Sequence, residues 1–187
     1  MANQQSAQPA DLRYPIGRYL PPETINARDL ALWINELAAL PAHLRRVVTG
    51  LSDDQLETPY RPDGWTVRQV AHHLADSHMN SYIRFKLALS KDTPAIVAYD
   101  ESAWAEMEDG KRAPIHLSLT LLEALHARWV LLLESMTEGD FSRAFKHPEY
   151  GAMRLDWALG LYAWHSRHHV AQIEALRSRQ GWDISAT

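Results

Sequence analysis

Residues 66–90, with the sequence TVRQVAHHLADSHMNSYIRFKLALS, contain the pattern that decides the fold. Thr66 and Gln69 match a capping box, in which the Thr oxygen and the Gln side chain satisfy free backbone donors at a helix N-terminus. Apolar side chains then recur at the three- and four-residue spacing of an amphipathic helix, namely Val67, Val70, Ala71, Leu74, Tyr82, Phe85 and Leu89. The stretch therefore predicts a long helix from about residue 66 to residue 90.

Three other stretches have the same helical spacing. Apolar positions between residues 26 and 48 predict a first helix, which Pro41 should kink without ending it. The leucine-dense residues 119–136, capped by Ser118, predict a third helix. Residues 155–181 predict a fourth, because Gly181 can adopt the left-handed conformation that ends a helix. Four long helices with almost no alternating strand pattern indicate an all-α protein, a four-helix bundle with one long crossover connection.

The remaining segments predict shorter features. Residues 91–114 form the long connection, with one short helix near residues 102–107. Ser52 and Gln55 match a second capping box, and residues 145–155 weakly favour a hairpin around Gly151. Residues 12–22 contain too many Pro and Gly residues for a helix, so we expect an extended N-terminal arm. We expect residues 1–11 to be a disordered tail and residues 12–187 to form a single domain.

Composition excludes several classes of function. The 187 residues include 19 basic and 23 acidic ones, a net charge of -4 without a basic block, so we expect no nucleic-acid partner. The chain has no cysteine, which excludes disulfides, thiolate metal sites and a cysteine nucleophile. No signal peptide is evident, and the longest apolar run, residues 157–164, is far shorter than the roughly 20 residues of a membrane span. We therefore expect a cytoplasmic protein without a membrane partner.

Two short clusters of histidines suggest a metal site. In the fourth predicted helix, His165 and His169 are about 40° apart around the helix axis, so they share one face. An inward-facing pair at this spacing can bind one metal ion, whereas a single buried histidine is more often a hydrogen-bonded core residue. His168 points farther round the helix. The pair therefore predicts two metal ligands.

The second cluster, on the helix predicted at residues 66–90, offers a third ligand. His78 lies nearest the centre of the apolar stripe, whereas His72 and His73 flank it, so periodicity alone slightly favours His78. Three histidines without a fourth protein ligand would leave one coordination position open, which is typical of catalytic rather than structural zinc.

Three stretches resemble the YfiT family of the DinB-like superfamily: residues 12–19 (LRYPIGRY), residues 58–90, and residues 159–176 (LGLYAWHSRHHVAQIEAL). The resemblance extends from residue 12 to residue 182. It implies a four-helix bundle whose metal is held by His73, His165 and His169, and on this point it replaces the preference for His78. Gln172 stands where the family often has histidine, so a contact behind the ligands or to substrate is expected to differ.

The resemblance implies two activities on a small-molecule substrate. One is metal-dependent hydrolysis, and the other is transfer of a low-molecular-weight thiol such as bacillithiol to an electrophile. It also implies a divalent metal, with zinc preferred and nickel as the alternative, and a homodimer. The non-enzymatic alternative is a dimeric bundle in which the metal serves stability alone.

The sequence identifies no catalytic residue besides the ligands. There is no HExxH motif, and the nearest carboxylate, Asp76, is interpreted either as an acceptor that orients a ligand histidine or as an ordinary helix charge. The extended arm, with its arginines and tyrosines, is a candidate to cover the mouth of the bundle. Five tryptophans are candidates for the wall of a pocket, although core packing is the more frequent role: Trp65, Trp104, Trp129, Trp157 and Trp164.

Overall fold

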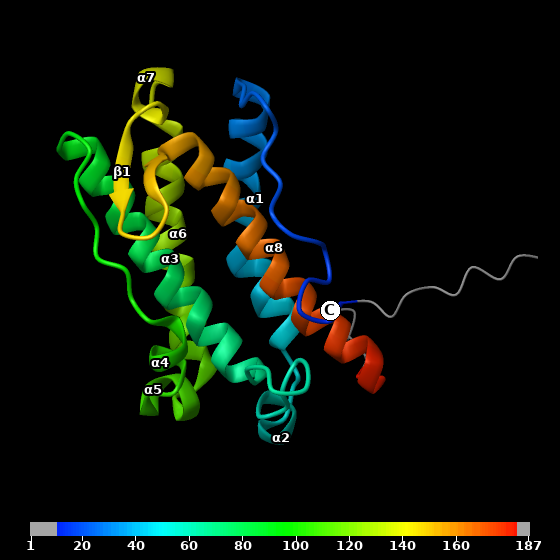
Figure 1. Ribbon diagram of the computed structural model, residues 1–187. Helices are drawn as coiled ribbons and strands as arrows, with labels where there is room; N and C mark the ends of the chain where they lie inside the picture. The colour runs from blue at the N-terminus through cyan, green and yellow to red at the C-terminus, as the bar shows by residue number, and fades with distance from the viewer. Residues whose placement is uncertain (1–10, 183–187) are drawn as a thin grey trace, which may run out of the picture.

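Four long helices form a four-helix bundle (Figure 1). The computed structural model describes residues 11–182, and the long helices in it are α1 (Ala27–Val48), α3 (Val67–Ser90), α6 (Ile115–Glu134) and α8 (Leu155–Gln180). The expected all-α bundle is confirmed. Except for Asp11, the predicted disordered tail at residues 1–11 lies outside the described residues.

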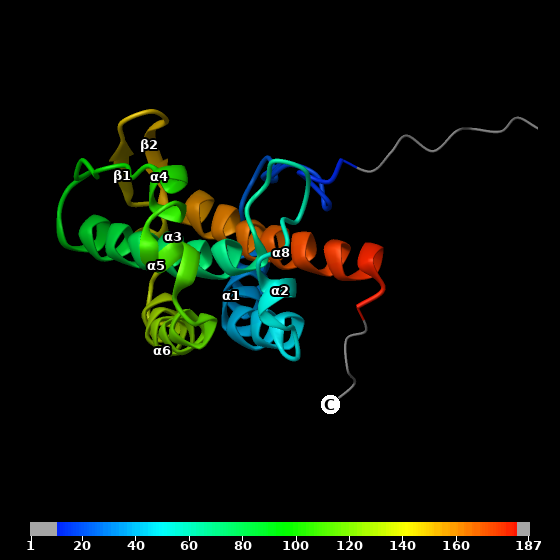
Figure 2. The ribbon, with the colours of Figure 1, turned by 90° about the horizontal axis from the view of Figure 1, so that it is seen from below.

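A layer of histidines divides the interior of the bundle. α1 packs against α6 and α8, and α3 packs against the same two helices (Figure 2). One apolar cluster includes Phe85 and Trp129, and a second, farther along the bundle, includes Leu74 and Leu122. Between these clusters stand buried histidines, His78 on α3 and His126 on α6. Because each fully buried large apolar side chain contributes about 1.5–3 kcal/mol, two such clusters can stabilise a fold with a polar layer between them.

The long crossover connects α3 to α6 and makes them run in the same direction. From the end of α3 the chain returns along the bundle, so that α6 starts near the end where α3 began (Figure 1). The crossover carries α4 (Glu101–Ala105) and α5 (Glu108–Arg112) where the sequence predicted one short helix. The reason is a second helix start, since Asp100 caps α4 through the Ala103 N–H at 2.9 Å and α5 begins separately after Met107.

A small β-hairpin follows α6 and α7 (Glu138–Phe141). Strands β1 (Ala144–His147) and β2 (Gly151–Arg154) are antiparallel, with Ala144 opposite Arg154, and Gly151 has a φ of 73° that suits glycine. The crossover joins this hairpin as a short parallel neighbour of β1, because the Ile96 N–H donates to the Lys146 carbonyl at 3.0 Å and the Lys146 N–H donates to the Pro94 carbonyl at 2.9 Å. The weakly favoured hairpin is therefore present.

Most predicted helix ends agree with the structure, and one does not. Thr66 caps α3 in a capping box with Gln69, and Gly181 ends α8 with a φ of 66°. A second capping box starts α2 (Asp53–Leu56). The prediction that Ser118 caps α6 was wrong. The helix begins one turn earlier, after Pro114. Proline is favoured at a helix start because backbone N–H groups there have no acceptor within the helix, so the lack of an N–H costs nothing. The Ser118 hydroxyl instead lies 2.7 Å from Nδ1 of His72.

The N-terminal arm runs along α8. It contains no helix or strand between residues 12 and 22, and the indole N–H of Trp164 donates to the Gly17 carbonyl at 3.2 Å. Gly160 of α8 allows a close approach, because a Cβ there would lie 2.8 Å from the ring of Trp33 and would also meet the Tyr19 hydroxyl. The arm is thus held against the helix that carries the histidine pair.

α6 has an unusually apolar surface. Among residues 11–182, it is the one helix with the length and hydropathy that a membrane span would need, although the core helix of a folded protein can meet the same criteria. Leu117, Leu121 and Leu131 are exposed on it, while its other side packs against α1 and α3. The sequence prediction had considered only the shorter apolar run in α8.

Candidate metal centre

Three histidine nitrogens converge between α3 and α8. Nε2 of His73 lies 3.2 Å from Nε2 of His165, and Nε2 of His169 lies 3.2 Å from the same atom. Two nitrogens bound tetrahedrally at 2.0–2.1 Å from zinc are about 3.3 Å apart. The two measured distances therefore suit one metal ion between the rings.

Hydrogen bonds behind His169 fix which of its nitrogens carries the proton. The Gln172 side-chain nitrogen donates to the Arg13 carbonyl at 3.0 Å, which sets the orientation of the amide because a carbonyl can only accept. The amide oxygen then faces Nδ1 of His169 at 2.8 Å. Nδ1 must donate to it, so Nε2 presents a lone pair toward the other rings. Lone pairs directed at one another are repulsive unless a cation lies between them, and the donor set thus fits a metal.

The electrostatics of the three rings favour the neutral form that a metal requires. Burial lowers the pKa of His73, His165 and His169 well below the usual histidine value, and neighbouring histidines lower each pKa further. A neutral imidazole can use its lone pair for a divalent ion, whereas a protonated ring cannot. The rings are therefore ready to bind metal at neutral pH.

The other histidines of the two clusters have different positions. His72 contacts the Ala113 carbonyl at 3.0 Å and the Ser118 hydroxyl, which places it away from the centre. His78, which periodicity alone favoured as a ligand, lies behind His165, with its Nε2 3.3 Å from Nδ1 of that ring. Periodicity failed to separate His73 from His78 because both lie near the buried side of α3. The structure places His73, as the resemblance implied, beside the helical pair.

Asp76 is not the acceptor that orients the pair on α8. The Nδ1 atoms of His165 and His169 contact His78 and Gln172 instead. Burial, with a smaller contribution from Asp109, raises the pKa of Asp76 to about 6. The interpretation of Asp76 as an orienting acceptor is therefore wrong for these two ligands, because the side chains that reach the rings come from a buried histidine and from the next turn of α8.

The three rings line an open cavity of about 720 Å³. Its walls come from segments far apart in the sequence: Arg13 of the arm, Trp65 before α3, Tyr99 of the crossover and Tyr150 of the hairpin. This volume lies within the range of small-molecule sites. Sequence reasoning missed the walls formed by the crossover and the hairpin, because no periodicity connects segments so distant along the chain.

Both cationic and anionic side chains line the cavity. Arg13, Arg61 and Arg84 line it together with Asp63, Glu101 and Glu149. Arg84 donates to the Tyr162 hydroxyl at 3.1 Å, and burial raises the pKa of Tyr99, so this phenol keeps its proton. The cavity thus offers several hydrogen-bond donors near the three histidines.

The arm and two of the five candidate tryptophans border the cavity. Tyr14 of the arm packs against the ring of His168, with 5.5 Å between ring centroids, so the arm lies at the mouth of the site as expected. Trp65 packs against His73 at 4.6 Å, and Trp164 also lines the cavity. Trp129 is instead fully buried in the core.

Comparison with known proteins identifies the family. The sequence profile of the DinB superfamily matches residues 36–173. The chain belongs to the DinB superfamily. It is 54% identical to YfiT of Bacillus subtilis (strain 168), a protein provisionally named a metal-dependent hydrolase, over 92% of this chain and 97% of that one. A Bacillus mycoides (strain KBAB4) relative with the same provisional name is 52% identical over 92% of this chain and 99% of its own.

A solved structure agrees with the superfamily assignment. The structure of YfiT from Bacillus subtilis, described as having an unusual four-helix bundle topology, matches with a TM-score of 0.90 and 54% identity, covering 92% of this chain and 99% of that one. This DinB superfamily member combines the helical bundle with a cluster of three histidines, as the resemblance implied.

Proposed function

We propose that this DinB superfamily protein is a metal-dependent hydrolase. His73, His165 and His169 would hold one divalent ion, zinc in preference to nickel. The observation that carries the proposal is the meeting of three neutral histidines, two buried and His165 half-buried, on the wall of an open cavity. A metal ion held by three histidines supplies a Lewis acid that activates water and polarises a carbonyl or phosphoryl oxygen.

Residues of the cavity would bind and orient a small polar substrate. Tyr99, whose pKa is raised by burial, keeps a hydroxyl proton to donate to a substrate oxygen. His147 accepts the Glu149 N–H on Nδ1 at 3.2 Å, and burial lowers the pKa of His147, so its Nε2 carries a proton and is also a donor. Arg84, held by the Tyr162 hydroxyl, adds a cation. These groups favour a substrate with several acceptor oxygens.

A second candidate is transfer of a low-molecular-weight thiol such as bacillithiol. The chain has no cysteine, so the thiol would come from a second small molecule. The cavity of about 720 Å³ has room for two small molecules, and its three arginines would suit an anionic thiol. A metal ion held by the three histidines would favour the thiolate form of this thiol. In the overall reaction the thiol sulfur would replace the leaving group on the electrophile, and the thiol proton would leave with that group or pass to solvent.

One assay separates these candidates. The zinc-loaded protein is mixed with a chromogenic aryl ester and, separately, with a chromogenic aryl electrophile, each with and without bacillithiol, and release of the leaving group is recorded. Release from the ester without thiol supports hydrolysis, whereas release that requires both metal and thiol supports transfer. Absence of turnover under all conditions supports the non-catalytic alternative, a metal-stabilised bundle. The His169→Ala variant is the control for background release.

We also propose that the protein forms a homodimer in the cytoplasm. The exposed leucines of α6, Leu117, Leu121 and Leu131, together with the exposed Leu32 of α1, supply apolar surface that a second copy would cover. Sedimentation equilibrium would give a mass of two chains, and Leu121→Glu with Leu131→Glu would give a monomer. A monomeric wild-type protein would contradict the proposal.

A further inference from the structure

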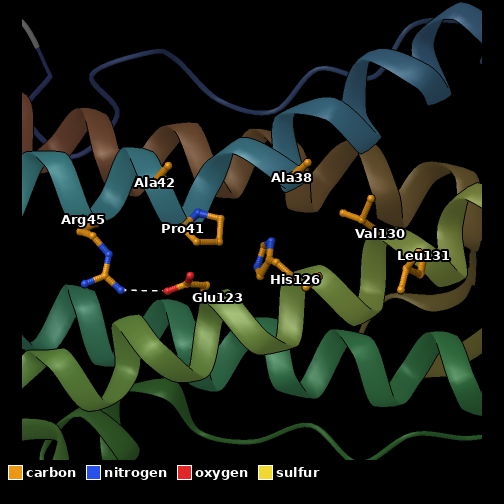
Figure 3. Close-up of a pocket in the computed structure, with 9 residues that line it drawn as sticks. Ala38, Pro41, Ala42, Arg45, Glu123, His126, Val130 and Leu131 are labelled. Atoms are coloured by element: carbon orange, nitrogen blue, oxygen red, sulfur yellow. Dashed lines mark hydrogen bonds and ion pairs between the residues drawn. The ribbon is translucent and has the colours of Figure 1, made fainter.

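Pro41 leaves a carbonyl of α1 without its helical partner. Proline has no backbone N–H, so the carbonyl of Leu37, four residues earlier, cannot receive the usual helix hydrogen bond. His126 of α6 takes this position, with Nδ1 2.6 Å from the Leu37 oxygen. Figure 3 shows the ring of His126 extending from α6 toward α1 beside Pro41. A bond between two helices thus replaces a bond within one.

The Leu37 carbonyl determines the direction of a chain of hydrogen bonds. Because a carbonyl can only accept, Nδ1 of His126 must carry the proton. Burial lowers the pKa of His126 to about 4, so the ring is neutral at pH 7 and its Nε2 is an acceptor. Nδ1 of His78 lies 3.0 Å from that Nε2 and must therefore donate to it.

The same reasoning extends to a ligand of the proposed metal centre. Since Nδ1 of His78 carries its proton, Nε2 of His78 is an acceptor. It lies 3.3 Å from Nδ1 of His165, which must donate. The proton of His165 is thus held on Nδ1, and the lone pair on Nε2 points toward His73 and His169. Each assignment follows from the one before it, starting from the carbonyl.

His78 of α3 and His126 of α6 are almost inaccessible to solvent, although His126 lines the pocket drawn in Figure 3. His78 is 0% exposed and His126 is 2% exposed. The rings of Trp129 and Tyr162 pack edge-on against His78 at 5.9 Å and 5.5 Å. Buried hydrogen bonds without competing water hold donors and acceptors in one arrangement.

We propose that His126 and His78 are positioning residues that hold His165 in the metal-binding tautomer. Together with the Leu37 carbonyl that Pro41 releases, they form a relay from α1 through α6 and α3 to α8. The inference rests on the proposed metal site. Without the relay, the proton of His165 could move to Nε2, where it would point at the other two ligands and block the ion. Groups that orient a metal-bound histidine typically affect metal affinity by about 10- to 100-fold.

The tautomers can be measured in the protein without metal. Protein with ¹⁵N-labelled histidine is treated with a chelator, and long-range ¹H–¹⁵N NMR spectra report which ring nitrogen carries the proton. We expect the proton on Nδ1 of His126, His78 and His165 at pH 7. A proton on Nε2 of His78 or of His165 would overturn the proposal, and this readout depends neither on metal binding nor on enzymatic activity.

Leucine and glutamine variants of similar volume isolate the hydrogen bonds from packing. His78→Leu removes the acceptor for His165 and should weaken zinc affinity, measured by competition with a chelator, by about 10- to 100-fold. His78→Gln keeps one donor and one acceptor and should recover most of this loss. His126→Leu should also bind zinc more weakly than His126→Gln. The loss should be smaller than at His78, because His126 is one ring farther from the proposed metal centre. Equal affinities for the Leu and Gln variants at both positions would contradict the relay.

A control and a separate outcome distinguish this proposal from the metal site itself. His72→Gln changes a buried histidine of the same helix that lies outside the relay, and it should leave zinc affinity unchanged. If the wild-type protein binds no zinc but shows the expected tautomers, the metal site fails and the relay stands. If a leucine variant does not fold, judged by circular dichroism, the NMR spectra of the wild-type protein decide.

Discussion

The side-chain oxygen of Gln172 accepts a hydrogen bond from Nδ1 of His169 at 2.8 Å, while the nitrogen of the same amide faces the N-terminal arm. That nitrogen donates to the Arg13 carbonyl at 3.0 Å and to Nε2 of His168 at 2.9 Å. One amide therefore orients a candidate ligand and also fastens the segment at the mouth of the cavity. A histidine at this position would have only two ring nitrogens for these three contacts.

Two substitutions of Gln172 should separate its two roles. Gln172→Leu removes the acceptor behind His169 and the anchor of the arm, so zinc affinity should fall by about 10- to 100-fold and amide exchange at residues 13–17 should accelerate. Gln172→Glu keeps the acceptor and loses the donor, so affinity should be retained while the arm still exchanges faster. Hydrogen–deuterium exchange and chelator competition measure the two effects. Arm exchange that is unchanged in both variants would contradict the anchoring role.

Removing a ligand should eliminate metal binding without unfolding the bundle. His169→Ala should bind no zinc in calorimetry, and saturating zinc should raise the melting temperature of the wild-type protein only. At a free zinc concentration of 100 times Kd the stabilisation would be about 2.7 kcal/mol. The exposed His116 provides the control, since His116→Ala should behave like wild type. Zinc stabilisation that persists in His169→Ala would exclude this residue as a ligand.

The metal-free protein should lose stability below pH 6.5. Burial lowers the pKa of His126 from 6.5 to about 4, so between these values the unfolded chain binds a proton that the folded chain does not. The contribution of His126 to the free energy of unfolding is therefore fully present above pH 6.5. It declines as the pH falls toward 4, with a slope near 1.4 kcal/mol per pH unit. Urea unfolding at several pH values with a chelator present measures the slope.

The His126→Gln variant tests the source of this pH dependence. Because glutamine does not titrate, the variant should show a smaller decline between pH 6.5 and pH 4, by about 1.4 kcal/mol per unit. The remaining decline belongs to other histidines whose pKa is lowered by burial, among them His78 and His165. A slope identical to that of the wild-type protein would show that His126 also titrates normally when folded.

A methyl group at Gly160 should disturb the contact between α8, α1 and the arm. The new Cβ would lie 2.8 Å from the ring of Trp33. The resulting displacement should destabilise the protein by about 1–3 kcal/mol, which exceeds the stability gained from the higher helix propensity of alanine. Gly139→Ala is a suitable control, because its Cβ would have a single neighbour, at 3.7 Å. Thermal unfolding compares the two, and equal stability would mean that the arm and Trp33 give way without cost.

The sequence predicts those parts of the fold that are encoded by local periodicity and helix caps. The capping box at Thr66 and the left-handed Gly181 place the ends of α3 and α8 correctly. The start of α6 was misplaced, because the hydroxyl of Ser118 has a tertiary partner in His72 that local sequence does not reveal.

The candidate site was less accessible to local reasoning. The pair on α8 follows from spacing within one helix, whereas the choice between His73 and His78 depends on how α3 packs against α8 and required the resemblance. His126 was overlooked, although it is a polar residue in a leucine-rich stretch, because its role depends on Pro41, 85 positions earlier in the chain.

The crossover and the hairpin form one connected part of the cavity wall, separate from the long helices. The two segments are joined between Ile96 and Lys146, and both contribute to the cavity wall, whereas the three histidines stand on the long helices. An insertion or deletion in either segment would reshape the wall as one unit and leave the histidine positions unaltered. Loop length can thus alter the shape of the cavity around a constant set of three histidines.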